Sequence, residues 1–150
     1  MIYLSDDITI QKQKPIFDTF YGALNGSDHT IKNLNQPLLS RIAPTGGIHR
    51  LTIKFAEITC FRENYGIVSR LNRGLLHSIS IQNSTIDSSA DYTGAICGKS
   101  TGHLKNITVS NVHIEGERKT GGVCGTALSS TDCRVKNASI NGKNSTGGGF

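Results

Sequence analysis

Apolar and polar residues along the chain follow a pattern that repeats about every 28 residues. Residues 47–53 recur as residues 75–81 and again as residues 103–109, each time with a step of 28 positions. Residues 134–140 read as a fourth copy, which implies a longer step of 31 positions and a short insertion around residues 129–133. A repeat of this length indicates a solenoid, in which each copy forms one supersecondary unit.

Each copy contains three short runs in which apolar and polar residues alternate, separated by Asn, Gly or Ser. This is the period of a strand, and no run shows the 3.6-residue period of a helix. Aligning the copies predicts four inward-facing columns: Leu51, Ile79, Ile107 and Ala138; Ile53, Ile81, Val109 and Ile140; Ile58, Ile86 and Ile114; and Val68, Ile96, Val123 and Phe150.

Three strands in a coil of about 28 residues is the geometry of a parallel β-helix, where each strand pairs with its equivalent one coil away. A leucine-rich repeat has a similar length, but its LxxLxLxxN pattern and its helical half are missing. We therefore predict an all-β chain that forms a right-handed parallel β-helix.

The two ends of the repeat array predict a cap and an open end. Residues 1–23 read as an N-terminal cap made of one strand and an aromatic plug that contains Phe17 and Phe20, and residues 24–150 read as the coils. Phe150 lies in the middle of a strand pattern, with no polar segment after it to cover the last core layer. We therefore expect that the natural protein continues, or that the open last coil supports end-to-end self-association.

Composition and charge exclude few functions. Net charge is +5 without a Lys/Arg block, which permits an anionic partner. No apolar stretch is long enough for a membrane span, and no signal peptide is visible. The cysteines Cys60, Cys97, Cys124 and Cys133 form no CxxC and no metal-ligand spacing, so we expect neither a cofactor nor a metal site. Buried thiols are the favoured reading, with a disulfide or a reactive thiol as the alternative.

One outward column reads as basic throughout, and it is our candidate binding site. Its members are Lys32, His49, His77, Lys105 and Lys136. A solvated face with splayed side chains is the simpler interpretation. The functional interpretation is a stripe that binds an anionic glycan, a cell-wall polymer or a nucleic-acid backbone. The stripe has no interleaved aromatic residues, which argues against single-stranded nucleic acid.

Asp87 and Glu115 align one coil apart, after Thr59 in the same column. Two neighbouring carboxylates can bind Ca²⁺ or perform acid/base chemistry on a sugar. No third acid falls in the column, so an incidental surface pair is the favoured reading. We find no HExxH and no supported catalytic triad, and we name no catalytic residue.

Three motifs resemble those of a known repeat family. Residues 21–34 (YGALNGSDHTIKNL) resemble the FxGxLDGNGHTIKNL opening of bacterial β-helix repeats of the GLUG type. Residues 94–98 (GAICG) and 121–125 (GGVCG) look like the GGLVG element of that motif. Residues 33–39 (NLNQPLL) are similar to the N-terminal β-helix region of immunoglobulin A1 metallopeptidases. GLUG repeats occur in adhesins, peptidases and surface proteins.

The resemblance implies a secreted or cell-surface bacterial location and three functions in order of preference. The first is a non-catalytic adhesive or spacer module of a surface or virulence protein, in contact with a host protein or an anionic glycan. The second is an accessory domain that positions substrate for a secreted zinc metallopeptidase. The third is a carbohydrate-active β-helix enzyme.

Overall fold

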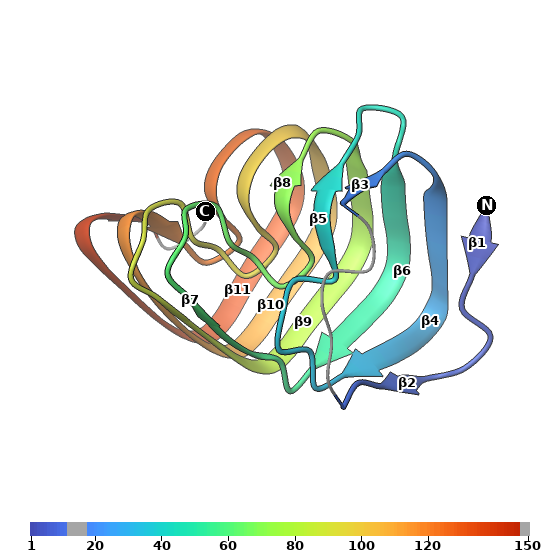
Figure 1. The fold of residues 1–150 in the computed structure, drawn as a ribbon, viewed down its shortest axis with the longest axis horizontal. Coiled ribbons are helices and arrows are strands. Elements are labelled where there is room, and N and C mark those ends of the chain that lie inside the picture. The colour runs from blue at the N-terminus through green and yellow to red at the C-terminus, as the bar shows by residue number, and fades with distance from the viewer. Residues whose placement is uncertain (12–17, 148–150) are drawn as a thin grey trace.

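Alternating Ile, Leu and Val residues favour extended strands that bury one side, and the chain forms a stack of such strands (Figure 1). The computed structural model describes residues 1–11 and 18–147, which contain β-strands and no helix. The strands are β1 (Ile2–Tyr3), β2 (Ile8–Thr9), β3 (Thr19–Phe20), β4 (Ala23–Lys32), β5 (Leu39–Ile42), β6 (Gly47–Lys54), β7 (Glu57–Cys60), β8 (Ser69–Asn72), β9 (Leu75–Ser88), β10 (Cys97–Gly121) and β11 (Cys124–Gly147).

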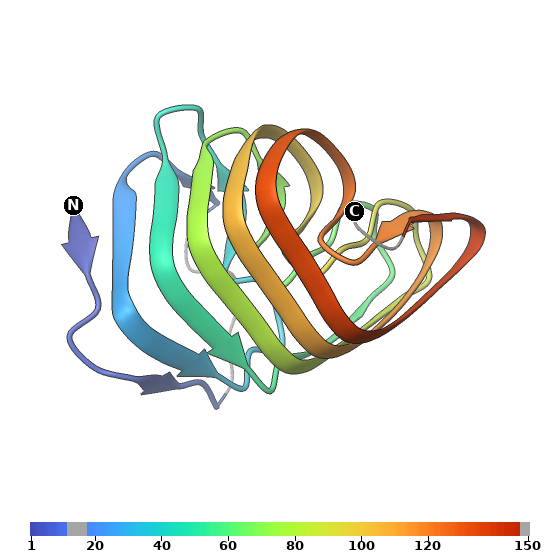
Figure 2. The same ribbon diagram turned by 180° about the vertical axis from the view of Figure 1, so that it is seen from behind.

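The strand pairings confirm the parallel β-helix. All pairs between the named strands are parallel, and they join strands of successive coils in one sheet. Strands β4, β6, β9, β10 and β11 lie side by side along one side of the stack, as Figure 2 shows from behind. Strands β3, β5, β8 and β10 form the opposite side.

The register confirms the 28-residue step for the central coils. Leu51 lies opposite Ile79, and Ile79 lies opposite Ile107, as the repeat predicts. The column of Ile58, Ile86 and Ile114 is also present, and all three side chains are buried. Stacked aliphatic columns of this kind form the narrow core of the molecule.

The predicted step of 31 residues in the last coil is wrong. Ile107 lies opposite Cys133, Val109 opposite Val135 and Ile114 opposite Ile140, so the step is 26 residues. No insertion is present around residues 129–133. Ala138 lies opposite Val112, and Ile140 opposite Ile114, so both belong to the next strand run of the coil and not to the run that the alignment predicted. In the third strand run, Val68 donates its backbone N–H to Ile96, and Ile96 donates to Val123, which confirms that column. Phe150 lies outside the described residues.

Corners between the strand runs are built by residues in the left-handed conformation. One corner column contains Arg50, Ser78, Asn106 and Asp132, a second contains Asn33, Phe55, Asn83, Asn111 and Asn137, and a third contains Asn64, Tyr92 and Lys119. Their φ values lie between 49° and 66°. Asn adopts this conformation more readily than other side chains that carry a Cβ, which explains why Asn dominates the second column.

The N-terminal segment extends the stack by short strands. The single strand predicted for the cap is instead two short ones, β1 and β2, each paired with β4. They are separated by a bend where the Asp7 carboxylate accepts the backbone N–H of Thr30 at 2.9 Å. Phe20 on β3 is buried in the core, whereas Phe17 lies outside the described residues. That residues 1–23 act as a separate cap stays a prediction.

The opposite end of the described stack is less covered. The inward residues Val135, Ala138 and Ile140 of β11 are only partly buried, although their partners one coil earlier, Val109 and Val112 among them, are buried. Among the described residues β11 pairs with β10 alone. End-to-end self-association through this coil stays a prediction.

Candidate binding surface

Three outward columns run along the side of the stack formed by β4, β6, β9, β10 and β11. The first contains His49, His77, Lys105 and Thr131, with the buried Asn25 at its N-terminal end; the second contains Thr30, Thr52, Ser80, Thr108 and Arg134; the third contains Lys32, Lys54, Gln82, Ser110 and Lys136. None of these residues is Asp or Glu. We call the surface made by these three columns the basic surface.

The five predicted binding residues do not form one column. His49, His77 and Lys105 are successive register partners, as predicted. Lys32 lies opposite Lys54, and Lys136 lies opposite Ser110, so both belong to the third column. The left-handed corner at Arg50, Ser78, Asn106 and Asp132 separates the first column from the other two.

The structure adds two cations that the sequence alignment missed. Lys54 lies between Lys32 and Gln82 in the third column, and Arg134 is the last member of the second column. Apart from the four lysines, Arg134 and the two histidines, the columns consist of hydroxyl and amide side chains. Strands one coil apart are separated by about 4.8 Å, so the surface presents cations and hydrogen-bond donors at a regular spacing.

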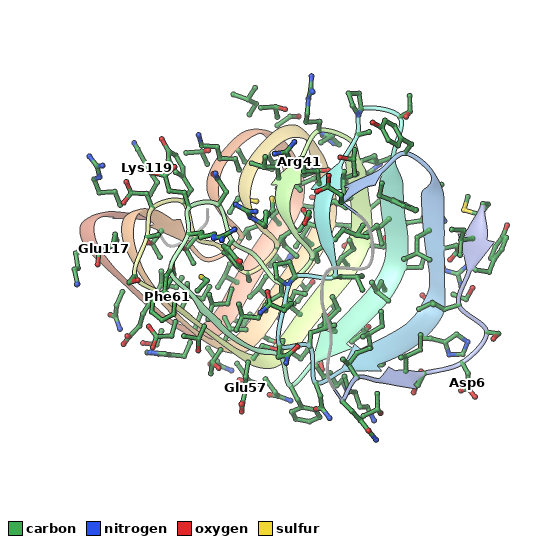
Figure 3. The ribbon with its side chains drawn as sticks, viewed as in Figure 1. Asp6, Arg41, Glu57, Phe61, Glu117 and Lys119 are labelled. Atoms are coloured by element: carbon green, nitrogen blue, oxygen red, sulfur yellow. The ribbon has the colours of Figure 1, made fainter. Side chains whose placement is uncertain are left out.

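Carboxylates gather on the adjacent side of the coils, across the corner column that contains Phe55 and Asn83. This side has two outward columns. One contains Glu57, Thr85, His113 and Ser139, and the other contains Thr59, Asp87, Glu115 and Asn141. We call this side the acidic face. Figure 3 shows Glu57 and Glu117 on the outside of the coils. The lysines of the third column and the carboxylates of the acidic face therefore lie on different sides of the β-helix, while Asp7, Asp28 and Asp132 border the basic surface at the first corner and at the N-terminal end.

The predicted pairing of Asp87 with Glu115 is confirmed by the register. Both residues line an open depression of about 430 Å³ on the acidic face, together with Glu117 and Lys143. Lys143 forms an ion pair with Glu117 at 2.8 Å, and His113 contacts Glu115 at 3.1 Å. Within residues 1–11 and 18–147 no group of three or more His, Cys, Asp and Glu side chains is arranged to hold a metal ion.

Two carboxylates near the corners are held in their charged form. The Arg118 guanidinium donates to the Asp91 carboxylate at 2.8 Å and lowers the pKa of that carboxyl. The Asp28 carboxylate accepts hydrogen bonds from Arg50, which lowers the pKa of Asp28. Both ion pairs join adjacent coils at their exposed edges, so they contribute little to stability individually.

Two aromatic residues lie near the third corner, on the side of the stack formed by β8 and β10. The Lys99 ammonium lies 3.9 Å from the centre of the Tyr92 ring, and the Arg70 guanidinium lies 5.2 Å from the centre of the Tyr65 ring. Each ring therefore makes a cation–π contact within the chain, and both lie on a different side of the β-helix from the basic surface.

Comparison with known proteins finds a partial relative. The chain is 32% identical to halomucin from Haloquadratum walsbyi over 117 residues, which cover 77% of this chain. The chain spans about 1% of the length of halomucin. No family model matches the chain, and no solved structure matches it. The described residues contain no helix with the length and apolar character that crossing a membrane requires.

Proposed function

We propose that this chain is a non-catalytic β-helix module of a secreted or cell-surface protein, and that its basic surface binds an anionic polymer such as an acidic glycan. The observation that carries the proposal is the sorting of charge. Lys32, Lys54 and Lys136 lie in one outward column of a surface whose three columns contain no carboxylate. A linear polyanion that lies along the stack would meet Lys32 and Lys54 at adjacent levels, and Lys136 three levels further on, beyond Gln82 and Ser110.

A repetitive module suits this role because binding would be spread over several coils. Each exposed ion pair contributes little, but contacts repeated along one polymer add up through effective concentration. The similarity to part of halomucin and the regular β-helix support a structural module in a secreted or surface protein. A GLUG-type origin of the repeats is part of the proposal and is based on residues 21–34, 94–98 and 121–125.

Two alternatives have different consequences. As an accessory domain of a zinc metallopeptidase, the module would position substrate for a catalytic domain located elsewhere in a longer protein. As a carbohydrate-active enzyme, it would use Asp87 and Glu115 in the depression on the acidic face. Loss of polysaccharide cleavage in Asp87→Asn and Glu115→Gln would favour the enzyme.

The proposal is tested by equilibrium binding of the chain to dextran sulfate, polygalacturonate and neutral dextran. We expect binding to the two polyanions only. Their affinity should fall at least about tenfold between roughly 0.05 and 0.3 M salt, because salt screens the charges and makes the release of bound counterions less favourable. Equal binding to neutral dextran, or affinity that does not change with salt, would contradict an electrostatic binding surface.

A further inference from the structure

We propose that Cys97 and Cys124 form a disulfide bond that links β10 to β11. The two Sγ atoms lie 3.0 Å apart, and both side chains are fully buried. The residues are register partners in the parallel pair of β10 and β11, so their side chains occupy the same inward column. This inference goes beyond the proposed function and does not depend on the basic surface.

Backbone geometry at this position is compatible with the bond. Parallel strands in register are about 4.8 Å apart, which falls within the Cα separation of about 4.4 to 6.8 Å found in disulfides. The same inward column contains Leu39 and Ser69 in the preceding coils, so the sulfur pair occurs only in the last two described levels.

Neither of the other two cysteines is a register partner of Cys97 or Cys124. Cys60 lies opposite Ser88 on β9, and the Cys133 thiol contacts the carbonyl oxygen of Thr131 at 3.7 Å. A bond between Cys97 and Cys124 closes a loop of one complete coil, since the two residues are 27 positions apart. It would attach β11, whose later inward residues Val135, Ala138 and Ile140 are only partly buried, to the well-packed part of the stack.

The chemistry is thiol–disulfide exchange with a disulfide-bonded oxidant. One cysteine thiolate attacks the disulfide of the oxidant, forms a mixed disulfide and releases the first thiol. The second cysteine thiolate attacks the mixed disulfide, forms the Cys97–Cys124 bond and releases the second thiol. Two electrons pass from the cysteines to the oxidant, and the two protons that the cysteines lose are gained by the released thiols.

Burial determines when this exchange takes place. It raises the pKa of the Cys97 thiol well above its ordinary value, and thiolate is the reactive species. We therefore expect the bond to form while the last coil is still open during folding, and to resist reductant once the coil has closed.

The test is to refold the wild-type chain from denaturant in a buffer of oxidised and reduced glutathione. We expect an intact mass lower by two hydrogen atoms, and two of the four cysteines protected from maleimide after denaturation. Trypsin combined with cleavage before Asp residues separates Cys124 from Cys133, because Asp132 lies between them. The digest should contain residues 91–99 linked to residues 120–131.

The control is the double variant Cys60→Ser/Cys133→Ser, which should form the same link. Single variants Cys97→Ser and Cys124→Ser should retain three reactive thiols. Four reactive thiols in the refolded wild-type chain, or linked peptides that contain Cys60 or Cys133, would overturn the inference. The wild-type result decides the question even if a variant does not fold, and it is independent of polymer binding.

Discussion

Lys32 and Lys54 lie directly opposite each other on adjacent parallel strands, one coil apart on the outer surface of the β-helix. Two like charges in register repel each other, and a structure that needed only stability would be expected to avoid this pair. An anion bound across the two ammonium groups removes that repulsion. Under the proposed function, binding and stability are therefore coupled at this pair.

This coupling predicts an effect of ligand on stability. Dextran sulfate should raise the urea midpoint of the wild-type chain at low salt, because a ligand that binds the folded state stabilises it. In Lys54→Gln the midpoint without ligand should be equal or slightly higher, and the increase on adding dextran sulfate should be smaller. An equally large increase in Lys54→Gln would place the polymer elsewhere on the molecule.

The side chain of Asn72 joins two adjacent coils. Its buried amide accepts the backbone N–H of Gly74 at 3.0 Å and donates to Ser100 Oγ on the next coil at 3.0 Å. Asn72→Ala leaves these partners unsatisfied, so we expect a loss of about 2 kcal/mol in the free energy of unfolding. Urea denaturation followed by circular dichroism measures it. The exposed Asn35→Ala should change the free energy by less than about 0.5 kcal/mol.

Phe55 is the exception in the corner column that otherwise contains Asn. It has a φ of 57° and is 48% exposed, so it bears the strain of a left-handed backbone while about half of its surface stays in water. Phe55→Asn should therefore stabilise the chain by about 0.5 to 1 kcal/mol. The reciprocal change Asn83→Phe at the equivalent corner should destabilise it. A higher urea midpoint for Phe55→Asn and a lower one for Asn83→Phe are expected, and a loss of stability in Phe55→Asn would contradict this account of the corner.

Acid should weaken the ion pair between Asp91 and Arg118. The pKa of Asp91 in the folded chain is lowered from its ordinary value of 3.8, chiefly by the hydrogen bond from the Arg118 side chain. The unfolded chain therefore binds the proton more readily, so the stabilising contribution is complete above pH 3.8 and is lost as the pH falls below it. Urea midpoints measured from about pH 5 to pH 2 should fall less steeply in Asp91→Asn than in the wild type. Identical slopes in the two proteins would show that the ion pair does not contribute to the loss of stability in acid.

The repeat was predictable because the inward Ile, Leu and Val residues keep one spacing through the central coils. Leu51, Ile79 and Ile107 could be aligned from sequence alone, and the structure confirms their stacking. Pairing of Asp87 with Glu115 followed from the same alignment. Stacking at a constant step converts sequence position into spatial position, which is why outward residues could also be placed in the central coils.

The last coil could not be aligned because two parts of each coil have the same apolar spacing. Inward residues at 104, 107 and 109 are separated by three and then two positions, and so are those at 109, 112 and 114, since a left-handed corner residue interrupts each run. Residues 135, 138 and 140 fit both patterns equally well. The structure selects the second, which moves Lys136 from the column of Lys105 to the column of Ser110.

Lys32 was misplaced for the same reason. Residues 31–34 were aligned with the first corner, whereas Ile31 lies opposite Ile53 and precedes the second corner. Lys54 was missed because its equivalents in the next two coils, Gln82 and Ser110, are uncharged. The left-handed conformation of Arg50, Phe55 and Tyr92 could not be predicted from sequence, because these residue types do not favour it. It is imposed by the position of each residue at a corner.

The central claim is that the basic surface binds polyanions, and the most direct measurement compares two charge variants in the same binding experiment. The triple variant Lys32→Gln/Lys54→Gln/Lys136→Gln removes the third column, while Lys143→Gln removes one positive charge from the acidic face. At low salt we expect the triple variant to bind dextran sulfate about tenfold or more weakly than the wild type, which corresponds to a loss of roughly 0.5 kcal/mol or more of binding free energy for each lysine. Its affinity should also depend less steeply on salt. We expect Lys143→Gln to bind like the wild type. Unchanged binding in a correctly folded triple variant, or an equal loss in Lys143→Gln, would contradict the account.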